Sequence, residues 1–166
     1  MTEAIHEAIA AKLQQAQSRY TRSRRALVDV LILAGNPMSV EQIVADAVTL
    51  PRPSVYRNLV VLQNCGVVRS IAGPDEFTRY ELDEHLTGHH HHLGCRSCGI
   101  MIDVELPVEL ERQIDQTTHA LAKQRGFLAE DHRLDVIAVC PACQSNQKAV
   151  KVGPTPPSES APSSND

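Results

Sequence analysis

Four consecutive histidines run directly into a pair of cysteines between residues 89 and 98, where the chain reads HHHHLGCRSC. Imidazole nitrogens and thiolates are ligands for Zn2+ and other first-row divalent metals. Expression tags lie at chain termini and do not continue into paired thiols, so this run is not typical of a tag or a low-complexity tract. The segment therefore predicts that the protein binds a metal ion, and that the other elements of the chain position this site.

A second C-x2-C pair, Cys140 and Cys143, repeats the spacing of Cys95 and Cys98. Four thiolates are a ligand set of tetrahedral structural Zn2+. Zinc binding in such sites contributes roughly 10–16 kcal/mol at neutral pH, comparable to the stability of a small domain, so we predict a structural role. A redox dithiol or an iron–sulfur cluster is compatible with the same spacing. Cys65, outside both pairs, is expected to be a small buried residue.

Successive histidines of an extended run face opposite sides, so His89 and His91 share one face and His90 and His92 the other. One run can therefore serve two metal centres. Acidic and imidazole side chains elsewhere are candidate partners: Glu81, Asp83, His85, Asp103, Glu109, Glu111, Asp115 and His132. Mixed sets of this kind suit Zn2+, Fe2+, Ni2+ or Mn2+, although each carboxylate can equally be a solvated surface charge. His119 has no matching partner and is interpreted as a surface or packing residue.

The first half of the chain must position these groups, and its apolar spacing predicts helices followed by a hairpin. The helices are expected at residues 3–18, 21–34, from 39 onward and at 54–63, and the strands at 67–71 and 77–82. A capping box, Ser39-x-x-Gln42, begins the third helix. This succession is the outline of a winged helix-turn-helix.

The second half predicts a strand at residues 100–106, a helix at 108–125 and a strand at 133–139. The inward-facing residues of this helix are expected to be Leu110, Ile114 and Leu121. A short sheet of this kind would gain by pairing across a dimer. The fold class is therefore α+β, with an N-terminal winged helix-turn-helix followed by a small α/β domain. The predicted divisions are 1–82 for the winged helix, 83–88 for the connection, 89–146 for the α/β domain and 147–166 for a disordered tail.

The formal charge of −4 is distributed unevenly over the 166 residues. Residues 1–80 carry nine Lys/Arg against seven Asp/Glu, whereas residues 81–166 carry seven against thirteen. The basic half can approach a polyanion, and the acidic half can collect cations. The chain contains neither a signal-type leader nor a run of 18 apolar residues, so we expect a cytoplasmic protein with reduced thiols and no membrane partner.

The order of motifs resembles the ferric uptake regulator (Fur) family of metal-responsive repressors. The resemblance spans about residues 19–145. The motifs that carry it are Thr21-Arg22-x2-Arg25, residues 54–59 (SVYRNL), Arg79-Tyr80-Glu81-Leu82, residues 89–99, Gly126-Phe127-x4-His132 and Cys140-x2-Cys143.

The resemblance implies a winged-helix DNA-binding domain at residues 1–82, a hinge at 83–88 and a metal-binding dimerisation domain at 89–146, with a regulatory metal near the hinge. The hinge-side site would use Glu81, His90, His92 and Asp103. The second site would use His89, His91, His132 and a carboxylate of the following helix. The structural zinc would bind Cys95, Cys98, Cys140 and Cys143. Because that helix is longer than usual in the family, Glu111 and Asp115 compete for the carboxylate role, which we assign to Glu111.

Some positions depart from the family pattern. The iron and peroxide sensors often supply a histidine just before the third helix, where this chain has Pro37-Met38. The zinc sensors often use an aspartate where this chain has Arg69, and a cysteine near the position of Asp83 or His85. The missing histidine before the third helix and the histidine-rich run favour Zn2+ slightly over Fe2+ as the regulatory metal, whereas Glu81 and Asp103 fit an iron sensor equally well.

Side chains that would contact DNA come from the fourth and second helices. Tyr56 and Arg57 would enter the major groove, with Ser54 and Asn58 adjacent. Contacts to backbone phosphates would come from Arg22, Arg24 and Arg25. Solvated surface charges are the alternative interpretation of these arginines.

The sequence therefore predicts a metal-dependent repressor of metal-homeostasis genes, which is not an enzyme and has no small-molecule substrate. It would bind a palindromic double-stranded DNA operator as a homodimer when its regulatory site is occupied. Alternatives are a peroxide-, nickel- or manganese-responsive regulator of the same family, a zinc-storage protein, or a metallohydrolase. The last lacks support because no H-E-x-x-H motif is present.

Overall fold

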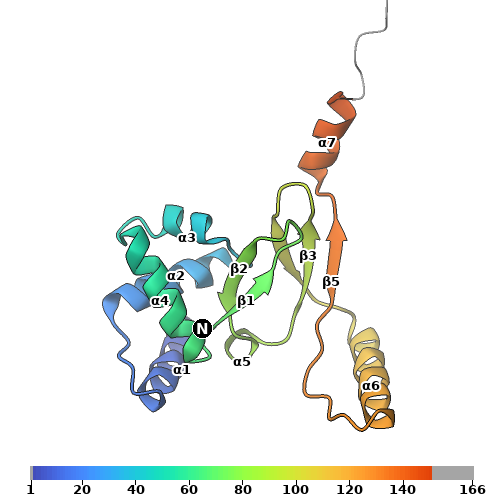
Figure 1. Ribbon diagram of the computed structural model, residues 1–166, viewed down its shortest axis with the longest axis horizontal. Coiled ribbons are helices and arrows are strands. Elements are labelled where there is room, and N and C mark those ends of the chain that lie inside the picture. Colours follow the sequence, from blue (N-terminus) through green and yellow to red (C-terminus); the bar gives the residue numbers. More distant parts are fainter. Residues whose placement is uncertain (1, 151–166) are drawn as a thin grey trace, which may run out of the picture.

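The computed structural model describes residues 2–150, with side chains described up to residue 146. Helices α1–α4 lie at one end of the molecule, and α6, β5 and α7 at the other (Figure 1). The first half contains α1 (Thr2–Gln15), α2 (Arg22–Ala34), α3 (Val40–Asp46), α4 (Arg52–Asn64), β1 (Val68–Ala72) and β2 (Thr78–Leu82). The second half contains α5 (Glu84–Thr87), β3 (His91–Cys95), β4 (Met101–Val104), α6 (Val108–Gln124), β5 (Asp135–Ala138) and α7 (Pro141–Val150). The α+β fold class with an N-terminal winged helix-turn-helix is confirmed.

Local signals define the winged-helix elements. Helix α2 ends at Gly35, whose positive φ of 58° places it in the left-handed region that glycine adopts readily. Ser39 and Gln42 form the predicted capping box: the Gln42 N–H donates to Ser39 Oγ at 3.2 Å, and the Ser39 N–H donates to Gln42 Oε1 at 2.7 Å. Helix α4 begins at Arg52, two residues before the predicted start, and Pro53 lies in its first turn, where proline is well tolerated.

The main hydrophobic core belongs to the winged-helix domain. Its fully buried side chains include Ile9, Leu13, Leu27, Ile43, Val55, Leu59 and Leu62. Among the described residues of 89–146, only Cys95 and Met101 are buried hydrophobic residues. The C-terminal unit therefore has little core of its own within one protomer.

The prediction that α6 turns its apolar residues inward is wrong for the single chain. No residue of α6, which lies wholly within the described part, is buried. Leu110 is 43% exposed and Leu121 is 57% exposed, and Ile114 is half-buried. The spacing correctly indicates one apolar helix face, but spacing cannot tell whether its own protomer or another molecule covers that face.

Strand β3, which carries the end of the histidine run, lies at the centre of the second sheet. It pairs antiparallel with β4 and parallel with β5. In this register His92 is opposite both Asp103 of β4 and Asp135 of β5. The sheet therefore places carboxylates on both sides of the central imidazole. The two flanking strands are shorter than predicted at both ends.

The predicted hinge at residues 83–88 contains the short helix α5. Asp83 caps it by accepting a 3.1 Å bond from the His85 N–H. The Asp83 carboxylate is therefore engaged by backbone. Helix α7 overlaps the first four residues of the predicted tail, and the remainder of that tail lies outside the described residues. Between residues 2 and 150, no helix is both long and apolar enough to cross a bilayer.

Leu62→Ala is expected to lower the free energy of unfolding by about 2–5 kcal/mol, because it leaves a cavity in the winged-helix core. Val60→Ala, on the same helix at a position 55% exposed, should change it by less than about 0.5 kcal/mol. Urea denaturation followed by circular dichroism measures both. Equal effects of the two variants would contradict the described packing of α4.

Candidate metal centres

The hinge-side cluster contains Glu81, His90, His92 and Asp103, whose potential ligand atoms lie within 4.8 Å of one another. Glu81 Oε2 is 3.0 Å from His92 Nε2 and 3.5 Å from His90 Nε2. Asp103 Oδ2 is 3.7 Å from His90 Nε2, and its Oδ1 is 4.0 Å from His92 Nε2. Two imidazoles and two carboxylates therefore surround one point, and Glu81 is the member that comes from the winged-helix domain.

Outer contacts orient both imidazoles of this cluster. His92 Nδ1 donates to Asp135 Oδ1 at 2.9 Å, and His90 Nδ1 donates to the Gly88 carbonyl at 2.9 Å. Each ring therefore presents Nε2 to the shared space, as metal-binding histidines do when a carboxylate or carbonyl holds the other nitrogen. Sequence reasoning missed Asp135 as part of the site, because its role depends on the pairing of β5 with β3.

The electrostatics of the cluster suit a cation. Burial raises the pKa of Glu81, but the His92 hydrogen bond and the Arg69 charge outweigh it, so the pKa lies below its ordinary value. Burial, together with the nearby Glu81 charge, raises the pKa of Asp103. Burial lowers the pKa of His92, but hydrogen bonds to Glu81 and Asp135 raise it overall. A divalent metal would replace the His92 Nε2 proton and stabilise both carboxylates in ionised form.

The second cluster contains His89, His91, Glu111 and His132. Three Nε2 atoms converge on the Glu111 carboxylate, at 3.2 Å from His89, 2.9 Å from His91 and 3.0 Å from His132. The structure thus brings together every residue that the sequence predicts for this site. The alternation of the histidine run separates them from His90 and His92.

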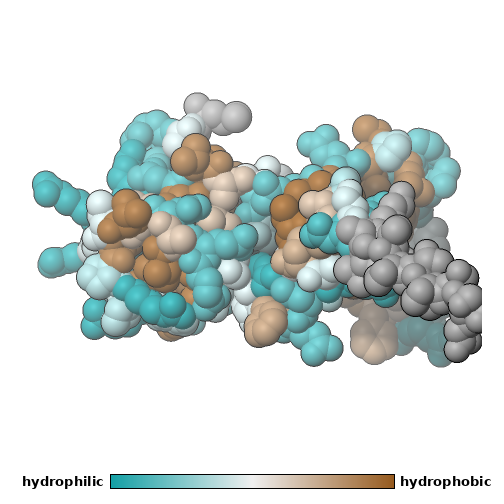
Figure 2. Space-filling view, turned by 90° about the horizontal axis from the view of Figure 1, so that it is seen from above, coloured by the Kyte–Doolittle hydropathy of each residue, from teal (hydrophilic) through white to brown (hydrophobic). Residues whose placement is uncertain are grey.

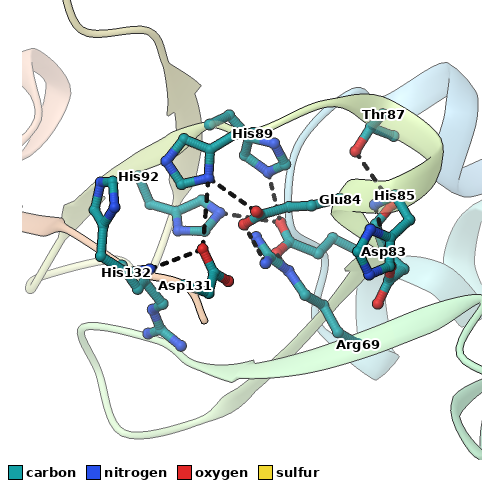
Figure 3. Close-up of polar contacts among 12 residues, drawn as sticks. Arg69, Asp83, Glu84, His85, Thr87, His89, His92, Asp131 and His132 are labelled. Carbon is teal, nitrogen blue, oxygen red and sulfur yellow. Dashed lines mark hydrogen bonds and ion pairs between the residues drawn. The ribbon is translucent and has the colours of Figure 1, made fainter. Parts of the chain in front are cut away.

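Carboxylates around the second cluster occupy outer positions. Glu84 Oε2 accepts from His89 Nδ1 at 2.9 Å and lies between His89 and Arg69 (Figure 3). Asp115 Oδ1 is 3.1 Å from His132 Nδ1, so it contacts the nitrogen that faces away from Glu111. Of the competing carboxylates, Glu111 alone belongs to the inner group. Glu109 pairs instead with Arg112 at 2.6 Å.

The third cluster contains Cys95, Cys98, Cys140 and Cys143. Cys95 ends β3 and Cys98 lies in the turn that leads to β4, whereas Cys140 follows β5 and Cys143 lies in the first turn of α7. The Cys98 and Cys140 sulfurs are 3.7 Å apart. The Cys140 backbone N–H donates to Cys95 Sγ at 3.2 Å and lowers the pKa of that thiol to about 6, whereas hydrogen bonding with the Cys140 thiol raises the pKa of Cys143 to about 12. Four converging sulfurs fit a tetrahedral Zn2+.

Cys65 lies outside this cluster. It is half-buried and packs against the winged-helix core.

The exposed face of α4 carries the predicted DNA contacts. Tyr56 is 42% exposed and Arg57 is exposed. Ser54 and Asn58 are half-buried, and Asn58 Nδ2 donates to Ser54 Oγ at 3.3 Å. Arg52, at the start of the same helix, lies with its guanidinium 5.7 Å from the Tyr56 ring centroid and pairs with Glu41 at 3.0 Å.

The three arginines predicted to contact phosphates differ in whether their guanidinium groups are already engaged within the protein. Arg22 is exposed at the start of α2. Arg24 donates to Ser18 Oγ at 3.0 Å, and Arg25 pairs with Glu3 at 2.8 Å. Arg22 is therefore the most available of the three.

The fold and its donor clusters define a winged-helix protein with a metal-binding C-terminal domain. The model of the ferric uptake regulator family matches residues 15–137, and the chain belongs to this family. Members of this family are metal-responsive transcriptional repressors that bind DNA as dimers. The protein is therefore a metal-responsive transcriptional regulator. The family predicted from the sequence motifs is confirmed.

The individual relatives share only about a quarter of their residues with this chain. The chain is 26% identical over 144 residues to the peroxide-responsive repressor PerR of Staphylococcus aureus, covering 84% of this chain and 91% of that protein. The ferric uptake regulator Fur of Helicobacter pylori, described with three functional metal-binding sites, superposes with a TM-score of 0.66 at 24% identity, covering 87% of this chain and 94% of that one. A zinc-bound manganese uptake regulator gives 0.60 at 24% identity, covering 80% and 98%. These structures share the fold.

Asp135→Ala is expected to weaken metal binding at the hinge-side cluster by about 10- to 100-fold, because His92 would lose the partner that orients its ring. Titration with competing chelators measures this affinity. Glu109→Ala is the control, because within the described residues Glu109 forms its ion pair with Arg112 and belongs to none of the three clusters. This variant should leave the affinity unchanged. Equal affinities for the Asp135 variant and the wild type would show that this contact does not prepare His92 for metal.

Proposed function

We propose that this protein is a metal-dependent repressor that binds a palindromic operator as a homodimer when its hinge-side site is filled. The observation that supports this most is the position of Glu81. It lies on β2 of the wing, yet its carboxylate is 3.0 Å from His92 of the next domain. A metal bound there would join the DNA-reading domain to the dimerisation domain.

Divalent metal would supply the positive charge that holds both carboxylates and both Nε2 atoms at one point. The packing of β2 against the rest of the winged-helix domain determines how a metal at this point would affect DNA binding. Because β2 belongs to the same packed domain as α4, fixing Glu81 against β3 fixes the direction in which α4 projects. In a dimer, two such helices must enter major grooves about one DNA turn, roughly 34–36 Å, apart.

Asn36 supplies a second connection across the domain boundary. Its Oδ1 accepts a 3.0 Å hydrogen bond from the backbone N–H of Asp103. Asn36 lies beside Pro37-Met38, where iron and peroxide sensors of the family often place a histidine. In this chain, we propose, the winged-helix domain holds the backbone of a metal ligand at this point instead of supplying a ligand itself.

The regulatory metal is proposed to be Zn2+, slightly favoured over Fe2+. Two imidazoles with two carboxylates suit either ion, and the oxygen content also admits Mn2+. The absence of a histidine at residues 37–38 favours zinc, whereas Glu81 and Asp103 fit an iron sensor equally well. The four cysteines are proposed to hold a structural Zn2+, and the cluster around Glu111 a further divalent metal.

Exposed apolar side chains on the C-terminal unit support the dimer. Ile102, Leu110, Leu121, Val136 and Ile137 are all between 40% and 62% exposed. Figure 2 shows hydrophobic surface in the right-hand half of the view as well as over the helical domain. A second copy of this domain would cover the apolar face of α6 and extend the buried core.

His90→Ala is expected to abolish the metal response of operator binding, because the hinge-side cluster loses one of its two imidazoles. In the wild type, the preferred metal should tighten operator binding by about 5- to 150-fold. Fluorescence anisotropy with a palindromic duplex, in separate titrations with buffered Zn2+, Fe2+, Mn2+ and Ni2+, measures both the response and the metal preference.

His119→Ala is the matched control, because His119 is exposed on α6 and belongs to none of the three clusters. It should respond like the wild type. If the wild-type protein bound the operator equally well with and without every metal, the proposed switch would be wrong.

Ile137→Glu is expected to dissociate the dimer, because it places a charge in the proposed interface on a side chain that is 62% exposed in the protomer. Val48→Glu adds the same charge at an 84% exposed position of the winged-helix domain and should leave the dimer intact. Sedimentation velocity distinguishes the two outcomes. A fully dimeric Ile137 variant would place the interface elsewhere.

A further inference from the structure

The wing contacts the dimerisation domain a second time, through a buried arginine. Arg79 of β2 is 5% exposed. Its Nη2 donates to the Gly99 carbonyl at 2.9 Å, and its Nε approaches the same oxygen at 3.3 Å. Asp75, at the tip of the wing, pairs with Arg79 Nη2 at 2.6 Å. We call this set of Arg79, Asp75 and Gly99 the wing–turn contact.

Gly99 belongs to the turn that presents two of the four cysteines. Its N–H donates to the Cys95 carbonyl at 2.8 Å, and it follows Cys98 directly. Its φ of +71° favours glycine. Arg79 therefore binds the backbone of the four-cysteine turn, one residue from a sulfur ligand candidate.

The wing tip lies too close to this turn for larger residues. A Cβ placed on Gly99 would overlap Asp75 and Arg79, and a Cβ on Gly94 would lie 2.9 Å from Pro74 Cγ. The tip also carries two carboxylates, Asp75 and Glu76, which DNA phosphates would repel. Its chemistry suits the turn of its own chain better than a DNA backbone.

The wing–turn contact and the hinge-side cluster use the same face of one strand. Arg79 and Glu81 are two residues apart on β2, so both point to the same side, and both are 5% exposed. Tyr80, between them, packs against the winged-helix core. One orientation of the wing therefore satisfies both Arg79 at Gly99 and Glu81 at His92.

We propose that Arg79 is a positioning residue that couples the four-cysteine turn to the regulatory metal site. With the cysteine site filled, the turn holds the Gly99 carbonyl where Arg79 can bind it, and the wing is held with Glu81 at its metal-binding position. The four-cysteine site then does more than stabilise its own domain: it raises the affinity of the regulatory site. The effect on DNA binding rests on the proposed function, whereas the effect on metal affinity does not.

The test is the affinity of the full-length dimer for the regulatory metal, measured without DNA by chelator competition. Arg79→Met keeps the apolar stem and removes the donors, and it should bind the metal about 5- to 150-fold more weakly. Arg79→Lys keeps the charge without the two-donor geometry and should lie between Met and wild type. Arg112→Met, which removes an arginine paired with exposed Glu109, is the control and should be unchanged.

Two further readouts separate coupling from a general loss of structure. Metal analysis must show the four-cysteine site fully occupied in each variant compared. Hydrogen exchange at residues 73–80 should be faster in Arg79→Met than in the wild type at equal regulatory-metal occupancy. If Arg79→Met loses its structural zinc, Arg79→Lys and Asp75→Asn, which keep Arg79 or its charge, carry the comparison.

The proposal would be overturned if zinc-replete Arg79→Met had the metal affinity and the hydrogen exchange of the wild type. If Arg79→Met does not fold, the same result in Arg79→Lys and Asp75→Asn would overturn it. A wild-type protein whose operator binding ignores the metal would refute the proposed switch, yet would leave the Arg79 effect on metal affinity measurable. The two failures are therefore distinguishable.

Discussion

A carboxylate of the winged-helix domain lies among the imidazoles of the next domain, and the remaining features of the proposed switch depend on it. Glu81 is buried, and a buried carboxylate is costly unless positive charge or hydrogen-bond donors compensate it. The orientation of β2 against β3 is therefore sensitive to what occupies the space between Glu81, His90 and His92. Metal at this point would act on the direction of α4 without touching α4 itself.

The two histidine clusters are also connected to each other. Arg69 of β1 forms ion pairs with both Glu81 and Glu84. Glu81 is an inner member of the hinge-side cluster, and Glu84 orients His89 of the other. Arg69 stands where the family resemblance implies an aspartate in zinc sensors, and here its cation pairs with a carboxylate beside each histidine cluster. The wing thus contributes Glu81 to the hinge-side cluster, contacts Glu84 beside the second cluster through Arg69, and binds the backbone of the four-cysteine turn through Arg79.

Features encoded by neighbouring residues were predictable from the sequence. The capping box at Ser39, the alternation of the histidine run and the pairing of C-x2-C motifs each depend on local spacing, and the structure follows them. The contacts of Asp135, Asn36 and Arg79 were not predicted, because they come from strand register and domain contact between residues distant in sequence. The face of α6 was placed inward for a related reason: one protomer's sequence does not say which molecule covers an apolar stripe.

Reciprocal linkage gives the most direct test of the claim that metal and DNA favour one arrangement of the two domains. The affinity of the dimer for buffered regulatory metal is measured with and without saturating operator duplex, keeping the four-cysteine site filled. Because two linked ligands share one coupling free energy, the operator should tighten metal binding by the same factor by which metal tightens operator binding, about 5- to 150-fold. An operator that binds yet leaves the metal affinity unchanged would contradict the account.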